Sequence, residues 1–217
     1  MNQAWSEQNK RMQALLKKST FDQGIEELLS LRKTLMEAMQ SWRERLSKED
    51  YSKQPFLNAE GYHSKTTAYS IWHIIRIEDI VVNMLIRDTE EVFFTGDFQR
   101  KTGSPIITTG NELVKEEIAA FSQKLDISAL YEYAEAVREN TDAWLRSIRY
   151  DDLKRRFADA DKEKIRALQV VSPDESAVWL IDYWCGKDVA GLLKMPLSRH
   201  WIMHIEAAER IISKIRK

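Results

Sequence analysis

The spacing of apolar residues along the chain predicts a protein built of helices. In several stretches the apolar residues recur three and four positions apart, the period that places them on one face of a helix. The clearest repeat is Ile25, Leu28, Leu29, Leu35, Met36, Met39, Trp42 and Leu46. Only residues 105–109 have a composition that favours a strand. The pattern therefore predicts an all-α fold.

Capping residues mark where these helices are expected to begin. The predicted helices cover residues 2–18, 22–46, 64–87, 111–125, 126–148, 172–186 and 198–217. The expected caps are Asp22, Ser64, Asn111, either Asp126 or Ser128, and the capping box Ser172-Pro173-Asp174-Glu175. Gly186 is expected to end a helix. The stretches 48–62 and 149–171 are predicted to be irregular, and 189–196 to be a short bridge.

The stretch 64–87 is predicted to be the central helix because it is apolar on nearly all sides. Its exceptions are Arg76, Glu78 and Asp79, which either support a functional site or form an ion pair at the helix edge; the ion pair is the default expectation. The connection that follows, 88–110, is long for a compact domain. Such a loop is often functional or contains small structure of its own.

Composition narrows the class of protein further. The chain has 217 residues, 33 Lys plus Arg and 34 Asp plus Glu, giving a net charge of -1, so no nucleic-acid partner is expected. The single Cys185 excludes an intrachain disulfide and fits a reducing compartment. No signal segment or long apolar run is present, which predicts a cytoplasmic protein without a membrane partner. We expect one domain over 1–217, with 1–20 as an N-terminal extension helix.

Three of the four histidines fall at inward-facing helical positions. His200 and His204 are four residues apart, so a helix places both imidazoles on one face. His73 shares the apolar face of the predicted central helix. Three histidines with an open position are typical of a catalytic zinc site, and imidazole also suits nickel. The alternative is that each is an ordinary core histidine; Trp201 also replaces the glutamate that a His-Glu-x-x-His protease needs.

These residues resemble a known family. The resemblance rests on Trp72-His73 with Ile77-Glu78-Asp79, on Trp179-Leu180 and Tyr183-Trp184, and on Met195-Pro196 followed by Arg199-His200-Trp201-Ile202-Met203-His204. Over roughly residues 24–217 the chain resembles the DinB/YfiT-like superfamily of bacterial helical-bundle metalloenzymes. The resemblance implies a four-helix bundle of up-down-down-up type, with long crossover connections and short extra helices. It also implies His73, His200 and His204 as ligands of one divalent metal ion, and a homodimer.

The resemblance further implies a class of reaction. Characterised relatives are often thiol-dependent transferases or isomerases that use low-molecular-weight thiols such as bacillithiol or mycothiol. A metal held by neutral imidazoles deprotonates a bound thiol, so we expect an S-transferase acting on a small molecule. Arg76 and Arg199 are candidate counter-charges for an anionic thiol, although surface ion pairs are the default expectation for both.

Several alternatives stay open at this point. The chain could instead be a non-catalytic metal-binding bundle, or a metal-water hydrolase with Glu78 or Asp79 as its base. Cys185 is expected to be a small buried apolar residue rather than a reactive thiol. His63 is expected to be a loop residue, with a fourth ligand or a substrate contact as its alternatives.

Overall fold

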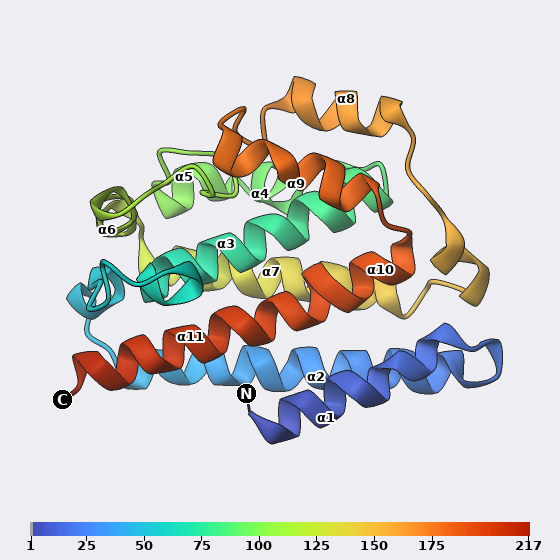
Figure 1. Cartoon of the computed structure of the whole chain (residues 1–217), viewed down its shortest axis with the longest axis horizontal. Coiled ribbons are helices and arrows are strands. Elements are labelled where there is room, and N and C mark those ends of the chain that lie inside the picture. The colour runs from blue at the N-terminus through green and yellow to red at the C-terminus, as the bar shows by residue number, and fades with distance from the viewer. Residues whose placement is uncertain (1) are drawn as a thin grey trace.

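The computed structural model describes residues 2–217 and is helical throughout (Figure 1). Within this range the only β pairing is an isolated bridge between Arg156 and Asp188. The all-α prediction is confirmed, and the stretch 105–109 forms no strand. Met1, the first residue of the predicted extension 1–20, lies outside the described residues.

Four long helices lie side by side (Figure 1). They are α2 (Phe21–Gln40), α3 (Thr67–Asp79, continued by a π-helical segment Ile80–Ile86), α7 (Ile127–Leu145) and α11 (His200–Ile215, preceded by a π-helical segment Met195–Arg199). Figure 1 shows α3 and α7 running in the same direction, and α2 and α11 running in the opposite one. Because α3 and α7 are parallel neighbours, the chain has to return along the molecule between them.

Shorter helices surround this group. They are α1 (Gln3–Arg11), α4 (Val92–Thr95), α5 (Phe98–Thr102), α6 (Glu116–Lys124), α8 (Asp159–Leu168), α9 (Glu175–Cys185) and α10 (Val189–Lys194). Single turns of 3-10 helix are Met12–Leu16, Lys18–Thr20, Ser41–Glu44, Glu49–Ser52, Gly61–Ser64 and Tyr150–Lys154. The segment that joins α3 to α7 contains α4, α5 and α6. The long connection 88–110 therefore does carry small structure of its own.

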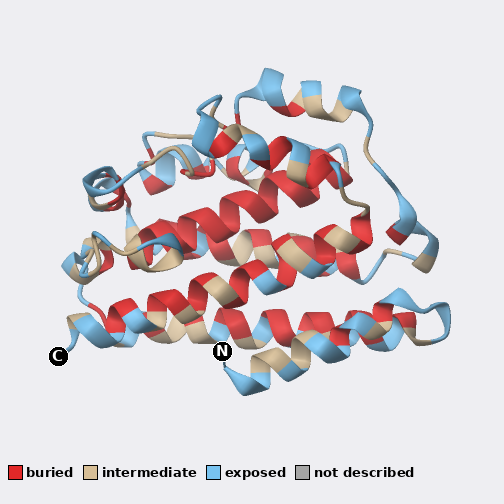
Figure 2. Cartoon of the chain, in the orientation of Figure 1, coloured by how far each residue is buried: buried red, intermediate tan, exposed pale blue. Residues whose placement is uncertain are grey.

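The prediction that α3 is central is confirmed. Every residue from Thr67 to Ile86 is buried, and the ribbon of α3 is coloured as buried along its length (Figure 2). Helices α7 and α11, together with the short helices α4 and α6, all pack against it. A helix covered on all sides has to carry apolar residues all round, which is the pattern that the sequence shows.

The N-terminal hairpin depends on one glycine. Helix α1 and the turn Met12–Leu16 pack against α2, and the backbone of Leu15 crosses directly over Gly24. A Cβ atom at Gly24 would overlap the backbone of Ala14 and Leu15. Gly24 therefore permits a contact between two backbones that no other residue would allow.

Several predicted helix starts are wrong by a few residues. Helix α3 begins after Thr66, whose hydroxyl accepts a hydrogen bond from Tyr69 N at 3.0 Å, while Ser64 ends the preceding 3-10 turn. Helix α2 begins one residue before the expected cap, so Asp22 lies in its first turn, where its charge favours the helix dipole. Asp126 caps α7 as one of the two alternatives predicted.

Other boundaries needed the tertiary structure. The helix expected from Asn111 begins only at Glu116, because the Asn111 side chain accepts a hydrogen bond from the Thr109 hydroxyl inside a loop. Asp174, not Ser172, caps α9, and Gly186 ends that helix as predicted. The stretch 149–171 is not irregular, since it contains α8, a charged helix with Ile165 as its one buried residue. The bridge 189–196 likewise contains α10.

None of the helices in residues 2–217 combines the length and the apolarity that crossing a membrane requires.

Candidate metal centre

The structure brings His73, His200 and His204 together. His73 lies in the middle of α3, while His200 and His204 occupy the first two turns of α11, which packs against α3. The imidazole centroids are 4.6 Å apart for His200 and His204, 4.7 Å for His73 and His204, and 5.1 Å for His73 and His200. One nitrogen of each ring lies within 4.8 Å of a nitrogen of the others. The three side chains can therefore reach one metal ion.

The orientation of His73 is fixed by a backbone carbonyl. His73 Nδ1 lies 2.8 Å from Thr109 O, and because a carbonyl only accepts hydrogen bonds, Nδ1 carries the proton. The other ring nitrogen, Nε2, then has its lone pair free to bind a metal. Ligand histidines commonly donate their second N–H to a carbonyl in this way. The ring of Tyr69 stacks on His73 with centroids 5.4 Å apart and ring planes at 11°, which limits its rotation.

The two histidines of α11 have polar atoms without partners. His200 Nδ1 and both ring nitrogens of His204 are buried and make no hydrogen bond within the described chain. An unsatisfied buried polar group costs about 1–3 kcal/mol, so three of them in one cluster need an explanation. A divalent cation that accepts one nitrogen from each ring would satisfy part of this set. The donor atoms present therefore fit a bound metal.

All three imidazoles are held neutral, the form that binds a metal. Burial lowers the pKa of His73 to about 4 and lowers the pKa of His200 and of His204 well below the ordinary value. The exposed fractions are 5% for His73, 7% for His200 and 2% for His204. At neutral pH no proton therefore has to be displaced from a ligand nitrogen before a metal binds.

A loop between α5 and α6 is attached to α3 next to the histidines. Four side chains on one side of α3 donate hydrogen bonds to four consecutive carbonyls of residues 107–110. The bonds are Arg76 to Ile107 O (2.6 and 3.1 Å), Trp72 Nε1 to Thr108 O (3.1 Å), His73 Nδ1 to Thr109 O (2.8 Å) and Tyr69 Oη to Gly110 O (3.0 Å). This segment, called the carbonyl loop below, thus sets the position of the group that orients His73.

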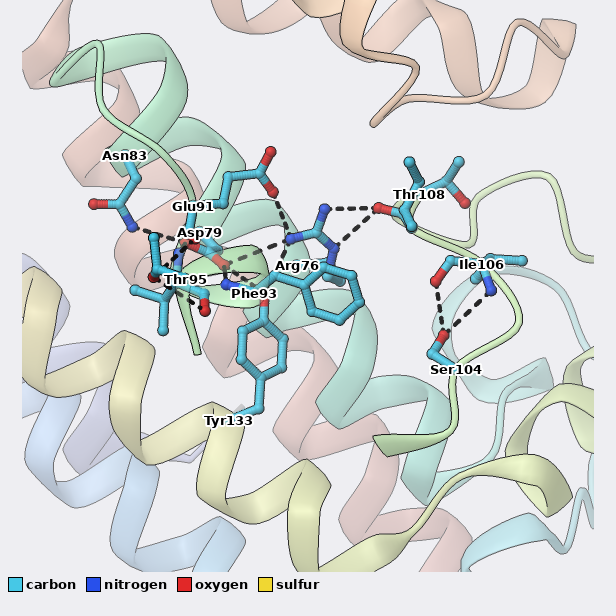
Figure 3. A network of polar contacts seen from close by, with 12 residues as sticks. Arg76, Asp79, Asn83, Glu91, Phe93, Thr95, Ser104, Ile106, Thr108 and Tyr133 are labelled. Carbon is cyan, nitrogen blue, oxygen red and sulfur yellow. Dashed lines mark hydrogen bonds and ion pairs between the residues drawn. The ribbon is translucent and has the colours of Figure 1, made fainter. Parts of the chain in front are cut away.

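Arg76 and Asp79 belong to a buried polar network that links α3 to Glu91 and Tyr133 (Figure 3). Arg76 donates to Glu91 at 2.6 Å and to the Tyr133 hydroxyl at 3.0 Å. Asp79 accepts from Tyr133 at 2.7 Å and from the backbone of Phe93 at 2.8 Å. Of the residues in this network, Arg76 alone also reaches the carbonyl loop. It can influence His73 only indirectly, through that loop.

Glu78 belongs to a second buried network. Arg32 on α2 donates to both Glu78 oxygens at 2.7 Å and to Asp142 at 2.7 Å. The expectation of ion pairs for Glu78 and Asp79 was correct, but the position was wrong, since both carboxylates are fully buried rather than at a helix edge. Arg199, by contrast, is exposed and makes no ion pair within residues 2–217. Its charge acts on Tyr62 at the rim of the site.

The histidines form the floor of a pocket of about 490 Å³. The other lining residues are Gly61, Tyr62, Ser64, Lys65, Tyr69, Ile77, Asn111, Trp179, Leu180, Tyr183, Trp184, Met195 and Pro196. Most of these side chains are aromatic or apolar, and none is a carboxylate. Lys65 is the only charged residue among them. A pocket of this size fits a small molecule.

Tyr62 and Lys65 line the pocket but were not predicted from the sequence. Lys65, Tyr69 and His73 are spaced four residues apart, so the interval that places Tyr69 beside His73 could also have indicated Lys65. Tyr62 lies edge-on to His204, with ring centroids 4.6 Å apart. It belongs to the connection before α3, where the spacing of apolar residues gives no indication of which side chains meet. His63 lies outside the cluster, and its Nε2 is 3.0 Å from Arg210.

Cys185 is buried, as predicted, and does not line the pocket. Burial raises the pKa of its thiol to about 11, so almost none of it is thiolate at neutral pH. Reactive cysteines have the opposite shift and some exposure. The structure therefore does not support Cys185 as a nucleophile.

Comparison with known proteins adds no assignment. No protein-family model matches the chain, and no curated protein matches it. The class that fold and site define is a helical protein with three buried histidines that could hold a metal ion.

Proposed function

We propose that this protein is a DinB-like metal-dependent enzyme, a thiol S-transferase that uses a low-molecular-weight thiol and acts on a small molecule. The observation that carries the proposal is the meeting of three neutral, buried imidazoles at the floor of a pocket that has no carboxylate lining. His73, His200 and His204 would hold one divalent ion, zinc or nickel. When bound, that ion would bind the thiol as its thiolate, the nucleophilic form, at neutral pH.

The arrangement of the helices supports the family assignment. The first proposed ligand comes from α3 and the other two from the start of α11, the positions that the resemblance implies. The parallel pair α3 and α7, flanked by α2 and α11 in the opposite direction, agrees with an up-down-down-up bundle (Figure 1). Residues 87–126 and 146–199 would be its long crossovers.

The residues of the pocket indicate which reaction they can assist. The Thr109 carbonyl keeps the proton of His73 on Nδ1 and its Nε2 ready for a ligand bond. The aromatic side chains Tyr62, Tyr183 and Trp184 line the same pocket as the histidines and offer apolar contacts to a substrate. None of the described lining side chains is a carboxylate that could act as a base. Glu78 and Asp79, the two bases considered from the sequence, lie outside the lining and are hydrogen-bonded to Arg32 and to Tyr133. This favours an externally supplied nucleophile over a hydrolase, which needs a base beside its water.

An open ligand position distinguishes an enzyme from a structural metal protein. Structural zinc sites are closed by a fourth protein ligand. In the part of the chain that the structure describes, the cluster contains three potential ligand residues and no fourth cysteine, histidine or carboxylate. A fourth position would then be free for a small molecule, which supports the catalytic proposal over a purely structural metal.

The metal is tested first. Protein purified without chelator should contain about one zinc or nickel ion per chain by elemental analysis. His204→Ala should lower the affinity for the metal at least about a hundredfold. Removing a side chain that only orients a metal ligand already costs about 10–100-fold, and removing the ligand itself costs more. His63→Ala is the matched control, because His63 lies outside the cluster, and should bind normally. If neither isolation nor titration gives stoichiometric metal, the proposal is wrong.

The reaction is tested with a panel of low-molecular-weight thiols and an electrophilic acceptor, followed by mass spectrometry. Conjugation should require both thiol and metal. Conjugation should persist in Cys185→Ala, because the Cys185 thiol is buried and does not line the pocket. It should disappear in His204→Ala, provided that circular dichroism shows this variant to be folded. Equal turnover in the wild type and in folded His204→Ala would contradict the mechanism. Metal binding without turnover would favour the non-catalytic alternative.

A further inference from the structure

Lys65 is placed where a ligand of the histidine cluster would meet it. The residue is in extended conformation between the 3-10 turn Gly61–Ser64 and Thr66, the cap of α3. Its side chain lines the same pocket as the histidines, and Nζ lies 4.9 Å from the centroid of the Tyr69 ring. Tyr69 in turn stacks on His73 at 5.4 Å. The ammonium group is therefore no farther from the His73 ring than these two distances together.

The charge of Lys65 is not balanced by the protein. The side chain makes no ion pair and no hydrogen bond with any residue in 2–217; its ammonium group lies over the Tyr69 ring, and its charge also acts on His73 and His204. No lining residue of the pocket is acidic. The carboxylate of Glu112 contributes to the raised pKa of Tyr69, but Glu112 does not line the pocket. It accepts a hydrogen bond from the Thr108 hydroxyl of the carbonyl loop. Arg199 adds a second unpaired cation near Tyr62.

A pocket with this charge distribution selects for anions. A divalent ion on three neutral imidazoles would add two positive charges at the floor, beside the charge of Lys65 at the wall. Uncompensated charges of one sign in a partly closed, largely apolar pocket attract a ligand of the opposite sign more strongly than they would in water. The aromatic wall of Trp179, Tyr183 and Trp184 suits the apolar part of such a ligand.

We infer that the small molecule bound at the histidine cluster carries a separate anionic group, such as a carboxylate, and that Lys65 binds this group. The inference rests on the proposed function, because it describes a second contact of the ligand that the histidine-bound metal would hold. Binding exchanges protons only: a thiol releases its S–H proton to solvent as the sulfur binds, and the anionic group is already charged.

The partial burial of Lys65 agrees with this role. Burial lowers the pKa of its ammonium group, so the charged form is poorly solvated in the empty pocket. A bound anion would replace the missing solvation and make a charge-assisted hydrogen bond. The alternative is that Lys65 only extends its chain across Tyr69 and keeps its charge in water, as many surface lysines do.

Two series of thiols of matched length test the inference. Mercaptoacetate, mercaptopropionate and mercaptobutyrate are compared with mercaptoethanol, mercaptopropanol and mercaptobutanol. Binding to cobalt-substituted protein is followed by the sulfur-to-cobalt charge-transfer absorption, which does not depend on turnover. We expect at least one carboxylate thiol to bind about tenfold or more tightly than its alcohol. In Lys65→Met that preference should fall to within about threefold, with the alcohols unaffected, while Lys65→Arg should retain most of it.

A control and a metal-free arm separate the possible failures. Lys101→Met is the matched control, because Lys101 lies over Phe98 at 4.8 Å but outside the pocket, and should behave as wild type. In metal-free protein, phenylacetate and phenylethanol are compared by tryptophan fluorescence; wild type and Lys101→Met should prefer phenylacetate, and Lys65→Met should not. Absence of the cobalt–sulfur band with every thiol would overturn the thiol mechanism. A carboxylate preference that is absent from wild type, or unchanged in Lys65→Met because the carboxylate binds the metal itself, would overturn the role of Lys65.

Discussion

Replacing Arg76 by methionine removes the guanidinium that joins the buried network of α3 to the carbonyl loop. Methionine keeps an unbranched apolar chain in place of the arginine stem, so the change removes chiefly the charge and its hydrogen bonds. The Glu91 carboxylate, the Tyr133 hydroxyl and the Ile107 carbonyl each lose a donor. Arg76 is fully buried and Glu91 is 3% exposed, so water cannot replace the lost partner.

The size of the effect follows from this burial. Removing one partner of a buried ion pair costs about 3–5 kcal/mol, because the other charge stays uncompensated. For a chain of this length about 2–4 °C of melting temperature is lost per kcal/mol, so we expect a decrease of roughly 6–20 °C. The matched control is Arg100→Met. Its ion pair with Asp97 is formed by side chains that are 77% and 54% exposed, and it should cost about 1 kcal/mol or less.

The loss should also depend on pH. Burial raises the pKa of Glu91, and Arg76 opposes that shift, so the variant should have a still higher pKa at Glu91. A carboxyl group with a raised pKa destabilises the fold only where it has to ionise. The loss of unfolding free energy that comes from ionising Glu91 is therefore absent below the pKa of a glutamate in the unfolded chain, about 4.3. It grows as the pH rises towards the pKa of Glu91 in the folded protein and is constant above that value. The difference between variant and wild type should thus be larger at pH 8 than at pH 5.

Urea unfolding followed by tryptophan fluorescence, in chelator at both pH values, measures these differences without a contribution from metal. A loss below about 1 kcal/mol at pH 8 would refute the view that Arg76 holds a buried charge. A loss of equal size at the two pH values would show that Glu91 is not the group left uncompensated. The same variant should bind metal about 10–100-fold more weakly, because the carbonyl that orients His73 loses its neighbouring anchor at Ile107.

Three other predictions concern the rest of the chain. Gly24→Ala should cost about 1–3 kcal/mol or more in urea unfolding, since its Cβ would overlap the backbone of Leu15; a neutral effect would contradict the close packing of the N-terminal hairpin on α2. Alkylation of Cys185 by iodoacetamide should be slow and keep accelerating up to about pH 10, because burial raises its pKa to about 11, and a plateau near pH 8 would contradict this. We also expect a homodimer, as the resemblance implies, which light scattering at micromolar concentration would disprove by giving a monomer mass.

The local pattern of the sequence was sufficient for the long helices and for the pairing of two of the three site histidines. Periodic apolar residues predicted the long helices, because an amphipathic or wholly buried helix leaves its signature within a few turns of sequence. The pair His200 and His204 followed from helical geometry alone, since residues four apart share a face. The inward position of His73 was predictable for the same reason. That it would meet the other two was a hypothesis drawn from three inward histidines and strengthened by the resemblance, because nothing local in the sequence relates α3 to α11.

The environment of the histidines was decided by tertiary structure. Asn111 was expected to begin a helix, but its side chain is used inside the loop that follows the carbonyls of residues 107–110. Those carbonyls meet α3 only because the chain returns over this helix. Every residue has the same backbone carbonyl, so the sequence cannot indicate which one accepts a hydrogen bond from His73. Arg76, Glu78 and Asp79 likewise looked like edge residues, since their partners Glu91, Arg32 and Tyr133 come from three other segments.

The sequence by itself determined where the long helices lie and which of their faces are apolar, because these depend on neighbours within about four positions. Only the packing of α3 against α11 and the carbonyl loop decided that three histidines meet, that His73 has a free Nε2, and that Lys65 is left without a counter-charge. These properties depend on distances between segments far apart in the chain. Burial then changes the chemistry of these side chains. The pKa of a group that is removed from water depends on the charged and hydrogen-bonding partners that the fold places beside it.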